Sequence, residues 1–526
     1  MAITYVLFQN IERQKNYQTI HYVVLFMKFK SLKIEKIYKY ISSVSRKAYA
    51  DPYLIANDVL CKQHTRGRVV ETCLSGETPK KSTFFFVAKK VFFYFLKNLA
   101  AFLLYLFGAL AHWLSRQSYR LPESGELLVL DIYIVVRKIH DSGKFADSFF
   151  PGLADALEKR KKKYVYTPRL FGSIQPLELY RAFRIFKENG DSILTEYQLL
   201  NLADYLEVVR FIFIYPISVL RFAKNLGNTY EDEVLRRGLY EALDSVAIGG
   251  YVRFLFGRRL SFIKTNKIKC LSWYENQVLD KNFYRGLRSI HREVNIIGAQ
   301  LFIRPHTLLN IFPDEGEACF GVVPNKVLVN GAGYLFELEN IPVSIGPALR
   351  YAYLFDEKDY QANGEIVLIV MPFVNSMTQH ILKVIREVDW LVPVEIKFHP
   401  STDIRKYKRE KSDRFFITNK SLPELLSKVL AVVGDGGLLL EAAALGIPTI
   451  VIQNRLEFNH DYMPELGNEI LWKKTANGND ITRLINKFQK TLELDPFRLK
   501  KEGERVKSSF FSEPTDELIG KAFELD

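Results

Sequence analysis

Short apolar runs alternate with helical patterns along most of this 526-residue chain. The runs at 126–136, 267–276 and 295–302 are separated by segments in which apolar residues recur every three to four positions, and the alternation begins again at 365–373. This alternation is typical of a parallel sheet that is covered by helices on both faces. The two series therefore predict an α/β protein with two Rossmann-like parallel-sheet domains, joined by the polar stretch 356–364.

Three units are expected along the chain. Residues 122–355 form the first α/β domain, in which we expect a strand at 192–197 and a long helical section at 199–256. Residues 356–526 form the second α/β domain, and residues 1–121 form a basic, apolar accessory segment without the alternation. Because ligands of open parallel sheets bind beyond the carboxyl ends of the strands, two facing sheets enclose a cleft with one substrate on each side.

The charge of the protein is concentrated at one end. The whole chain has a formal net charge of +14, and residues 1–120 contain 19 Lys and Arg against 6 Asp and Glu. The four cysteines are scattered without a CxxC pair, which argues against a zinc site or a disulfide framework and fits a reducing compartment. The start of the sequence lacks the pattern of a secretory signal, so we expect no cleavable signal peptide.

The most apolar stretch, FFFVAKKVFFYFLKNLAAFLLYLFGALAHWLSR, runs from Phe84 to Arg116. It is long enough to span a membrane, which takes about 20 apolar residues. However, Lys89, Lys90 and Lys97 are spaced so that they can share one face, as in a helix that lies in the plane of an anionic membrane surface. A buried core helix is the third possibility. Nucleic-acid binding is a rival explanation of the basic region, but no nucleic-acid motif accompanies it, and we expect no nucleic-acid partner.

The stretch VVGDGGLLLEAAALGIPTIVI, 432–452, predicts a strand, a tight turn, a helix and a second strand. Gly434, Asp435, Gly436 and Gly437 form the turn, where small residues and a helix start make a candidate phosphate site. Glu441 lies about one turn into the helix and is a candidate partner for ribose hydroxyls. The alternative is an ordinary βαβ turn in which Asp435 caps the helix and Glu441 is a solvated side chain.

The stretch VEIKFHPSTD, 394–403, places His399 and Pro400 at the end of another strand of the second series. Proline ends the strand, so the imidazole is expected at the same sheet edge as the glycine turn. A histidine hydrogen-bonded to a phosphate there can stabilise a departing nucleotide or give it a proton.

In the first series, SWYENQVLDKNFYRGLR at 272–288 places Glu275 at the carboxyl end of a strand. A carboxylate in this position is a candidate base for an acceptor hydroxyl, and Asp280 is the competing candidate. A cap of the following helix is an equally good interpretation of Glu275.

The ordered series WYENQ, IIGAQ, VNGAGY, IGPALRY, KFHPS and GDGGLLLEAAALGIPTIVI resembles the GT-B glycosyltransferases of bacterial surface-carbohydrate synthesis over about 126–511. Similar families are the capsule Kdo transferases, the sialyl- and polysialyltransferases with an HP motif, and the CDP-glycerol glycerophosphotransferases. The resemblance implies a metal-independent transferase without a cofactor, whose second domain binds the donor and which acts at the cytoplasmic membrane face on a lipid-linked or polymeric acceptor. It further implies that His399 is the HP histidine, Glu441 the helix carboxylate and Glu275 an acceptor-side base. The remaining candidates are Pro400 and Ser401 for the donor and Asn276, Gln277, Gln300 and Arg350 for the acceptor.

Two positions depart from these families. Gln300 is followed by Leu301 and Phe302 where relatives commonly have Gln-His-Gly, and Asp435 stands where they commonly have Ser or Thr. Our leading hypothesis is an inverting, nucleotide-sugar-dependent glycosyltransferase, with a slight preference for a CMP-linked sugar. The alternatives are transfer of a polyol phosphate from a CDP-linked donor, a nucleotide-sugar epimerase, and a scaffold of the same shape without turnover.

Overall fold

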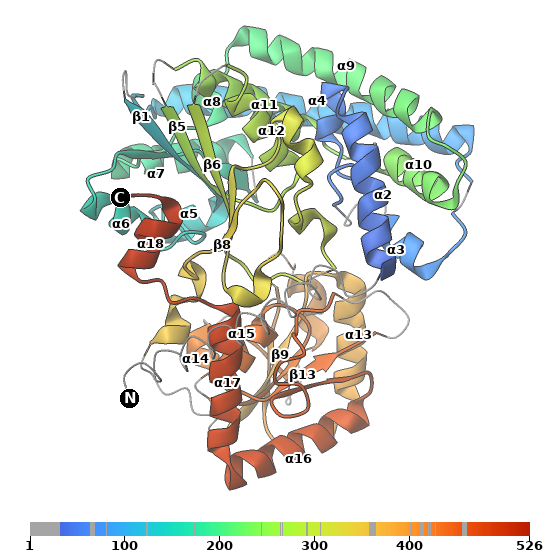
Figure 1. The fold of residues 1–526 in the computed structure, drawn as a ribbon, viewed down its shortest axis with the longest axis vertical. Helices are drawn as coiled ribbons and strands as arrows, with labels where there is room; N and C mark the ends of the chain where they lie inside the picture. Colours follow the sequence, from blue (N-terminus) through green and yellow to red (C-terminus); the bar gives the residue numbers. More distant parts are fainter. Residues whose placement is uncertain are drawn as a thin grey trace, which may run out of the picture.

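The computed structural model describes residues 32–526 except 64–68, 80, 122–124, 173–174, 244, 264, 266, 291–292, 306, 357–363, 400–401, 403, 411–414, 419, 421, 427 and 455–459. Its described part contains two six-stranded parallel sheets, one in each half of the molecule (Figure 1). The strands are buried on both faces, which explains why their sequences are continuous apolar runs. The expected α/β class with two Rossmann-like sheets is therefore confirmed.

The first sheet has the order β3-β1-β5-β6-β7-β8. Its strands are β1 (Glu126–Asp131), β3 (Tyr164–Tyr166), β5 (Lys267–Trp273), β6 (Glu293–Gln300), β7 (Lys326–Val329) and β8 (Val343–Ile345). A small separate sheet pairs β2 (Tyr133–Val135) with β4 (Arg169–Phe171). The helices of this half before residue 200 are α5 (Val136–Ser142), α6 (Leu153–Lys159), α7 (Pro176–Asn189) and α8 (Glu196–Leu199).

Two expectations about this half are corrected. The run 126–136 is not one strand, because the chain leaves the sheet after Asp131, pairs with β4 as β2, and starts α5 at Val136. The predicted strand 192–197 is reduced to a single bridge between Ile193 and Tyr166, since α8 begins at Glu196. The long helical section consists of α9 (Leu202–Lys224), α10 (Tyr230–Ala242) and α11 (Ile248–Ser261), and α12 (Val278–Leu287) follows β5.

Short 3-10 turns connect the later strands of the first half. They are η2 (Leu309–Ile311), η3 (Glu315–Phe320), η4 (Ala332–Tyr334) and η5 (Leu349–Phe355). The chain passes from η5 towards the second half.

The second sheet has the order β11-β10-β9-β12-β13-β14. Its strands are β9 (Ile366–Val370), β10 (Val394–Lys397), β11 (Phe415–Ile417), β12 (Val429–Gly434), β13 (Thr449–Ile452) and β14 (Trp472–Thr475), and the sequence patterns did not predict β14. Counted from the first strand of this half, the order is 3-2-1-4-5-6, as in dinucleotide-binding Rossmann folds. The helices are α13 (Asn375–Arg386), α14 (Leu422–Leu426), α15 (Leu438–Ala444) and α16 (Gly478–Leu494), with a 3-10 turn η6 (Ile404–Glu410).

The last two helices connect the halves. α17 (Pro496–Phe510) packs against α15, and the chain then returns to the first half, where α18 (Asp516–Phe523) packs against α6 (Figure 1). Phe523 is buried in the core of the first sheet, and Arg160 donates hydrogen bonds to Asp516 at 3.0 Å. The C-terminal residues thus lie with the first half, although the sequence placed all of 356–526 in one unit.

The described part of the accessory segment contains α2 (Leu32–Ala48), η1 (Pro52–Ala56), α3 (Val69–Ser75) and the 32-residue α4 (Phe84–Ser115). α4 packs along α7, α8 and α9. By length and composition it is the one helix among the described residues that meets the criteria for a membrane span, and only 17% of its apolar window is buried. The interpretation of this stretch as a buried core helix is therefore wrong.

Candidate functional site

Each sheet has one place where the direction of strand order reverses. In the first sheet this switch point lies between β1 and β5, and in the second it lies between β9 and β12. Ligands of open parallel sheets bind beyond the carboxyl ends of the strands at such a switch point. Glu275 follows β5, and Gly434 ends β12. The two motifs that the sequence singled out thus border the two switch points.

A buried ion network lies at the first switch point. Asp131, at the end of β1, accepts hydrogen bonds from Arg253 at 2.7 Å and from the Ser272 hydroxyl at 2.8 Å. Arg169 pairs with both Asp131 and Asp280, the latter at 2.6 Å. These side chains are almost fully buried, so Asp280, the competing candidate base, is a structural partner of Arg169. The only sign of this network in the sequence is an aspartate at the end of a buried apolar strand.

Glu275 is partly exposed beyond the end of β5. Its carboxylate accepts hydrogen bonds from the Trp273 indole at 2.9 Å and from the Gln277 amide at 2.8 Å. Desolvation raises the pKa of Glu275, which the Trp273 hydrogen bond partly offsets. The N-cap of α12 is Gln277, whose backbone N–H is bound by Asp280 at 2.8 Å, so Glu275 is not the helix cap.

Arg350 links the two halves electrostatically. It is exposed, and its guanidinium lies over the ring of Trp273, 5.2 Å from the centroid. Its positive charge lowers the pKa of Glu275 in the first half and that of Glu441 in the second. Arg350 thus lies over the indole that donates to Glu275, and Tyr353 of the same turn η5 donates to Glu441.

The other acceptor-side candidates are mainly structural. The Asn276 side chain is fully buried and donates to the Asn310 carbonyl at 2.7 Å. Gln300 is buried, donates to the Ile311 carbonyl at 2.7 Å and accepts a hydrogen bond from Arg304. Leu301 lies in the core of the first sheet, fully buried. The structure thus brings Gln277 and Arg350 to Glu275 but keeps Gln300 inside the protein.

The glycine turn lies against β9. A Cβ on Gly434 would come within 2.1 Å of the Val370 carbonyl oxygen, and both Gly434 and Gly436 have positive φ, 143° and 128°. Only glycine fits this close approach. α15 has just seven residues, so its helix dipole is smaller than we expected. Its N-cap is Gly437, so Asp435 is not the cap. Burial raises the pKa of Asp435 to about 7, with a further contribution from Asp461.

Glu441 sits where the halves meet. The Tyr353 hydroxyl, from η5, donates a hydrogen bond of 2.5 Å to its carboxylate. Burial raises the pKa of Glu441 to about 7, against the lowering effects of Tyr353 and Arg350. A Cβ on Gly437 would lie 3.1 Å from Ile303, which follows β6 of the first half. The solvated Glu441 of the alternative interpretation is not observed.

His399 is exposed at the end of β10, and its ring lies edge-on to Phe373, 5.9 Å between centroids. Partial desolvation lowers its pKa. Pro400 and Ser401 lie outside the described residues. Beside His399, a cavity of about 470 Å³ opens at the carboxyl ends of β9 and β10, lined by Phe373, Asn375, Thr378, Gln379, Thr402, Lys406 and Tyr407.

A larger hollow of about 800 Å³ lies along α16 and the start of α17, lined by other residues than these candidates. Among the described residues, no group of three or more His, Cys, Asp and Glu is arranged to hold a metal ion.

No protein-family model and no curated protein matches the sequence. Among solved structures, the chain is similar to the UDP-GlcNAc 2-epimerase of Neisseria meningitidis, with 12% identity and a TM-score of 0.42 over 76% of this chain and 100% of that one. It is also similar to HepE of Anabaena in complex with UDP-glucose, with 10% identity and a TM-score of 0.39 over 76% and 98%. MurG of Acinetobacter baumannii has 9% identity and a TM-score of 0.39 over 76% and 99%. Likenesses at this level leave function to be argued from the site itself.

Proposed function

We propose that the protein is an inverting, nucleotide-sugar-dependent glycosyltransferase that acts in cell-surface polysaccharide or glycolipid synthesis. The observation that carries the proposal is the position of η5, whose Arg350 lies over Trp273 beside Glu275 and whose Tyr353 binds Glu441. A candidate base of one sheet and a candidate ribose ligand of the other therefore both lie next to η5. This is the arrangement that transfer between two substrates, one on each sheet, requires.

The second half binds the donor in this proposal. The nucleotide extends from the cavity beside His399, across the end of β9, to the glycine turn, and Glu441 binds the ribose hydroxyls. Asp435 is about half protonated at neutral pH, because its pKa is about 7. The neutral carboxyl does not repel a phosphate and can donate a hydrogen bond to a phosphate oxygen. His399 is neutral when no ligand is bound, and a bound phosphate favours its protonated form, which stabilises the departing nucleotide.

The first half binds the acceptor. Glu275 takes the proton of an acceptor hydroxyl, whose oxygen attacks the anomeric carbon as the bond from that carbon to the phosphate oxygen breaks. A base with a raised pKa is effective near neutral pH. Attack on the face opposite the leaving group inverts the configuration. With His399 and Arg350 as the sources of positive charge, we expect activity without a metal ion, which persistence in a chelator tests. A CMP-linked sugar is slightly favoured by the HP motif.

The proposal includes an anionic membrane surface, at the cytoplasmic face of the inner membrane, as the place where a lipid-linked or polymeric acceptor is met. Large apolar side chains are exposed on α4 and on the adjacent α9, and the two helices contact through Phe95 and Phe213. The exposed set comprises Leu99, Leu103, Leu106, Phe107, Leu110 and Trp113 on α4 and Leu202, Leu206, Phe213 and Ile217 on α9. Apolar surface of this extent, with Lys89 and Lys97 exposed on the same helix, fits a membrane interface.

Flotation with vesicles tests the membrane part. The protein should float with vesicles that contain anionic lipid, less so at high salt, since each lysine near such a surface contributes about 1 kcal/mol. The double variant Leu103→Glu/Phe107→Glu should remain at the bottom, whereas Leu494→Glu, at an exposed leucine of α16, should float normally. Equal flotation of all three proteins would contradict this part.

Thermal melting with CMP, CDP, UDP, GDP and TDP, for the wild type and His399→Ala, tests the donor site. A ligand at 100 times its Kd stabilises the protein by about 2.7 kcal/mol, a shift of several degrees. The proposal expects one nucleotide to stand out and its shift to shrink in the variant. No shift with any nucleotide would favour the scaffold without turnover. A shift with CDP, and polyol phosphate transfer from a CDP-linked donor, would favour the phosphotransferase instead.

A further inference from the structure

We propose that the accessory segment is a positioning element for Glu275, and that Lys62 is the residue through which it acts. This inference rests on the proposed function, because it assigns a role to the segment in the chemistry at Glu275. The segment was expected only to associate with a membrane. Its contacts instead lead step by step from α2 to the loop that carries the candidate base.

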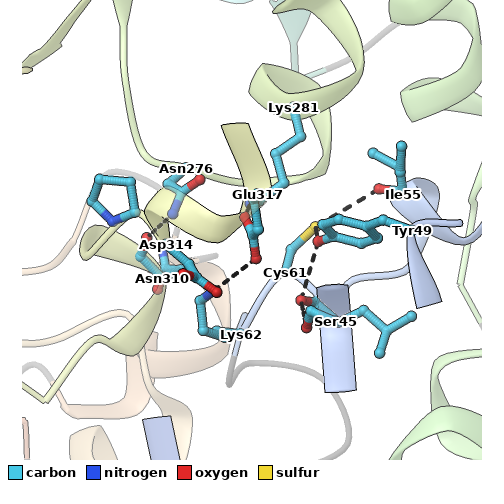
Figure 2. A network of polar contacts seen from close by, with 12 residues as sticks. Ser45, Tyr49, Ile55, Cys61, Lys62, Asn276, Lys281, Asn310, Asp314 and Glu317 are labelled. Atoms are coloured by element: carbon cyan, nitrogen blue, oxygen red, sulfur yellow. Dashed lines mark hydrogen bonds and ion pairs between the residues drawn. The ribbon is translucent and has the colours of Figure 1, made fainter. Parts of the chain in front are cut away.

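The first step joins the accessory segment to residues 309–320, which comprise η2 and η3. The Tyr38 hydroxyl of α2 contacts the carbonyl oxygens of Phe312 and Pro313, at 3.0 and 3.1 Å. Arg46, also on α2, pairs with Asp314 at 3.0 Å. The Lys62 ammonium pairs with Glu317 at 3.1 Å, inside the protein (Figure 2).

The second step joins residues 309–320 to the Glu275 loop. The Asn276 amide donates to the Asn310 carbonyl at 2.7 Å (Figure 2). The Asn310 amide in turn donates to the Glu275 carbonyl at 2.7 Å. Asn276 has a φ of 54°, in the left-handed region, which asparagine adopts more readily than other non-glycine residues. Glu317 also pairs with Lys281 of α12, the helix that starts two residues after Asn276. Glu317 thus connects Lys62 to the end of the same loop.

Among Lys62, Glu317 and Lys281, Lys62 is the residue whose substitution best tests the link, and the reason is the balance of charges. Lys62, Glu317 and Lys281 are each 0% exposed at the side chain, so two ammonium groups share one carboxylate inside the protein. Removal of Glu317 would leave two buried cations without it, which is strongly destabilising. Removal of the Lys62 charge leaves Glu317 paired with Lys281, and the charges of these two residues cancel. An apolar side chain at residue 62 therefore breaks the link while it preserves the fold.

The effect on Glu275 follows from its desolvation. Its raised pKa depends on burial within a well-held loop. When the loop loosens, water reaches the carboxylate and its pKa falls towards the ordinary value, so the acidic limb of the kcat/KM profile moves to lower pH. A misplacement of about 1 Å can cost about a hundredfold in rate. We expect kcat to fall about ten- to a hundredfold in Lys62→Met.

Hydrogen exchange of the full-length protein tests the inference without any assay of turnover. Amides at 274–278 should exchange faster in Lys62→Met than in the wild type, while amides at 432–441 exchange as before. The matched control is Lys47→Met, the same substitution at an exposed lysine of α2, which should change neither peptide. Tyr38→Phe, which loses only the hydroxyl, is the second variant and should loosen the same loop to a smaller extent.

Unchanged exchange at 274–278 in folded Lys62→Met and Tyr38→Phe would overturn the inference. If the exchange changes as expected but the wild type transfers no sugar, the positioning stands and the proposed function fails. If the wild type is active, the lower kcat and the shifted acidic limb in Lys62→Met complete the test. If Lys62 only stabilised the fold, Lys62→Met would lower the amount of folded enzyme, and the acidic limb of the kcat/KM profile would stay at the same pH.

Discussion

If the glycine turn binds the donor phosphate as proposed, Asp435 should make donor binding depend on pH. Its pKa is raised from the ordinary value of 3.8 to about 7 by burial beside the glycine turn. About ten in eleven molecules have a neutral Asp435 at pH 6, and about one in eleven at pH 8. Because a carboxylate next to a phosphate is repulsive, the affinity for a nucleotide sugar should fall about tenfold between these pH values, or about 1.4 kcal/mol. Asp435→Asn should lose this tenfold contribution, because the amide is neutral throughout, and keep only the pH dependence that comes from protonation of His399.

Titration calorimetry with the nucleotide sugar checks this prediction. A nucleotide sugar is preferable to a free nucleotide, because a phosphate monoester ionises near pH 6 and would add its own slope. At pH 8, Asp435→Asn should bind about tenfold more tightly than the wild type does. Glu441, which has a similar pKa of about 7, lies at the ribose and not at the phosphate, so Glu441→Gln is the control and should retain the tenfold contribution of Asp435. A slope in Asp435→Asn as steep as in the wild type would refute the reasoning.

The raised pKa of Asp435 also affects the stability of the folded protein. The folded protein binds the Asp435 proton more tightly than the unfolded chain does, so its contribution favours folding below pH 4 and is lost as the pH rises from about 4 to about 7. Asp435→Asn should therefore melt at a higher temperature than the wild type at pH 8, and a lower melting temperature would contradict the burial of an ionised carboxylate.

Three further predictions concern single residues. Glu275→Gln should lower the transfer rate about 10²- to 10⁴-fold in an assay of nucleotide release while it keeps the melting shift, and near-normal turnover would exclude Glu275 as the base. Gly434→Ala should cost about 3 kcal/mol or more in urea unfolding because its Cβ would collide with a strand carbonyl, whereas Gly436→Ala, which meets nothing within 4 Å, should cost less. Asp131→Asn should cost about 3–5 kcal/mol, because it removes the buried charge that Arg253 binds, and a small loss in the same experiment would argue against this ion network.

Local patterns predicted the fold well where a strand is buried on both faces. The runs that became β5, β6, β9 and β12 are continuous and apolar, and the helices between them have a clear three-to-four period. The short run 192–197 was predicted wrongly, because it contributes one bridge at the edge of the sheet before α8 begins. β14 was missed because its sequence, WKKT, has two lysines at its centre, and these positions are only partly buried.

The site was predictable only in part. The glycine turn and Glu275 stand directly after apolar strands, and that position is visible in the sequence. The buried ion network joins Asp131 to Arg253, 122 residues away, and such a pairing has no local signal. Gln300 was a candidate because of its motif, but Arg304 and Ile311 hold it inside the protein. Which polar residues face a ligand depends on contacts that only the folded chain shows.

A crystal structure with the nucleotide sugar identified by melting is the most direct test of a transfer site between the two sheets. We expect the donor phosphate at Gly434–Gly437 beside His399, the ribose at Glu441, and the anomeric carbon on the side of Glu275 and Arg350. A nucleotide bound elsewhere, or a sugar directed away from Glu275, would contradict the account.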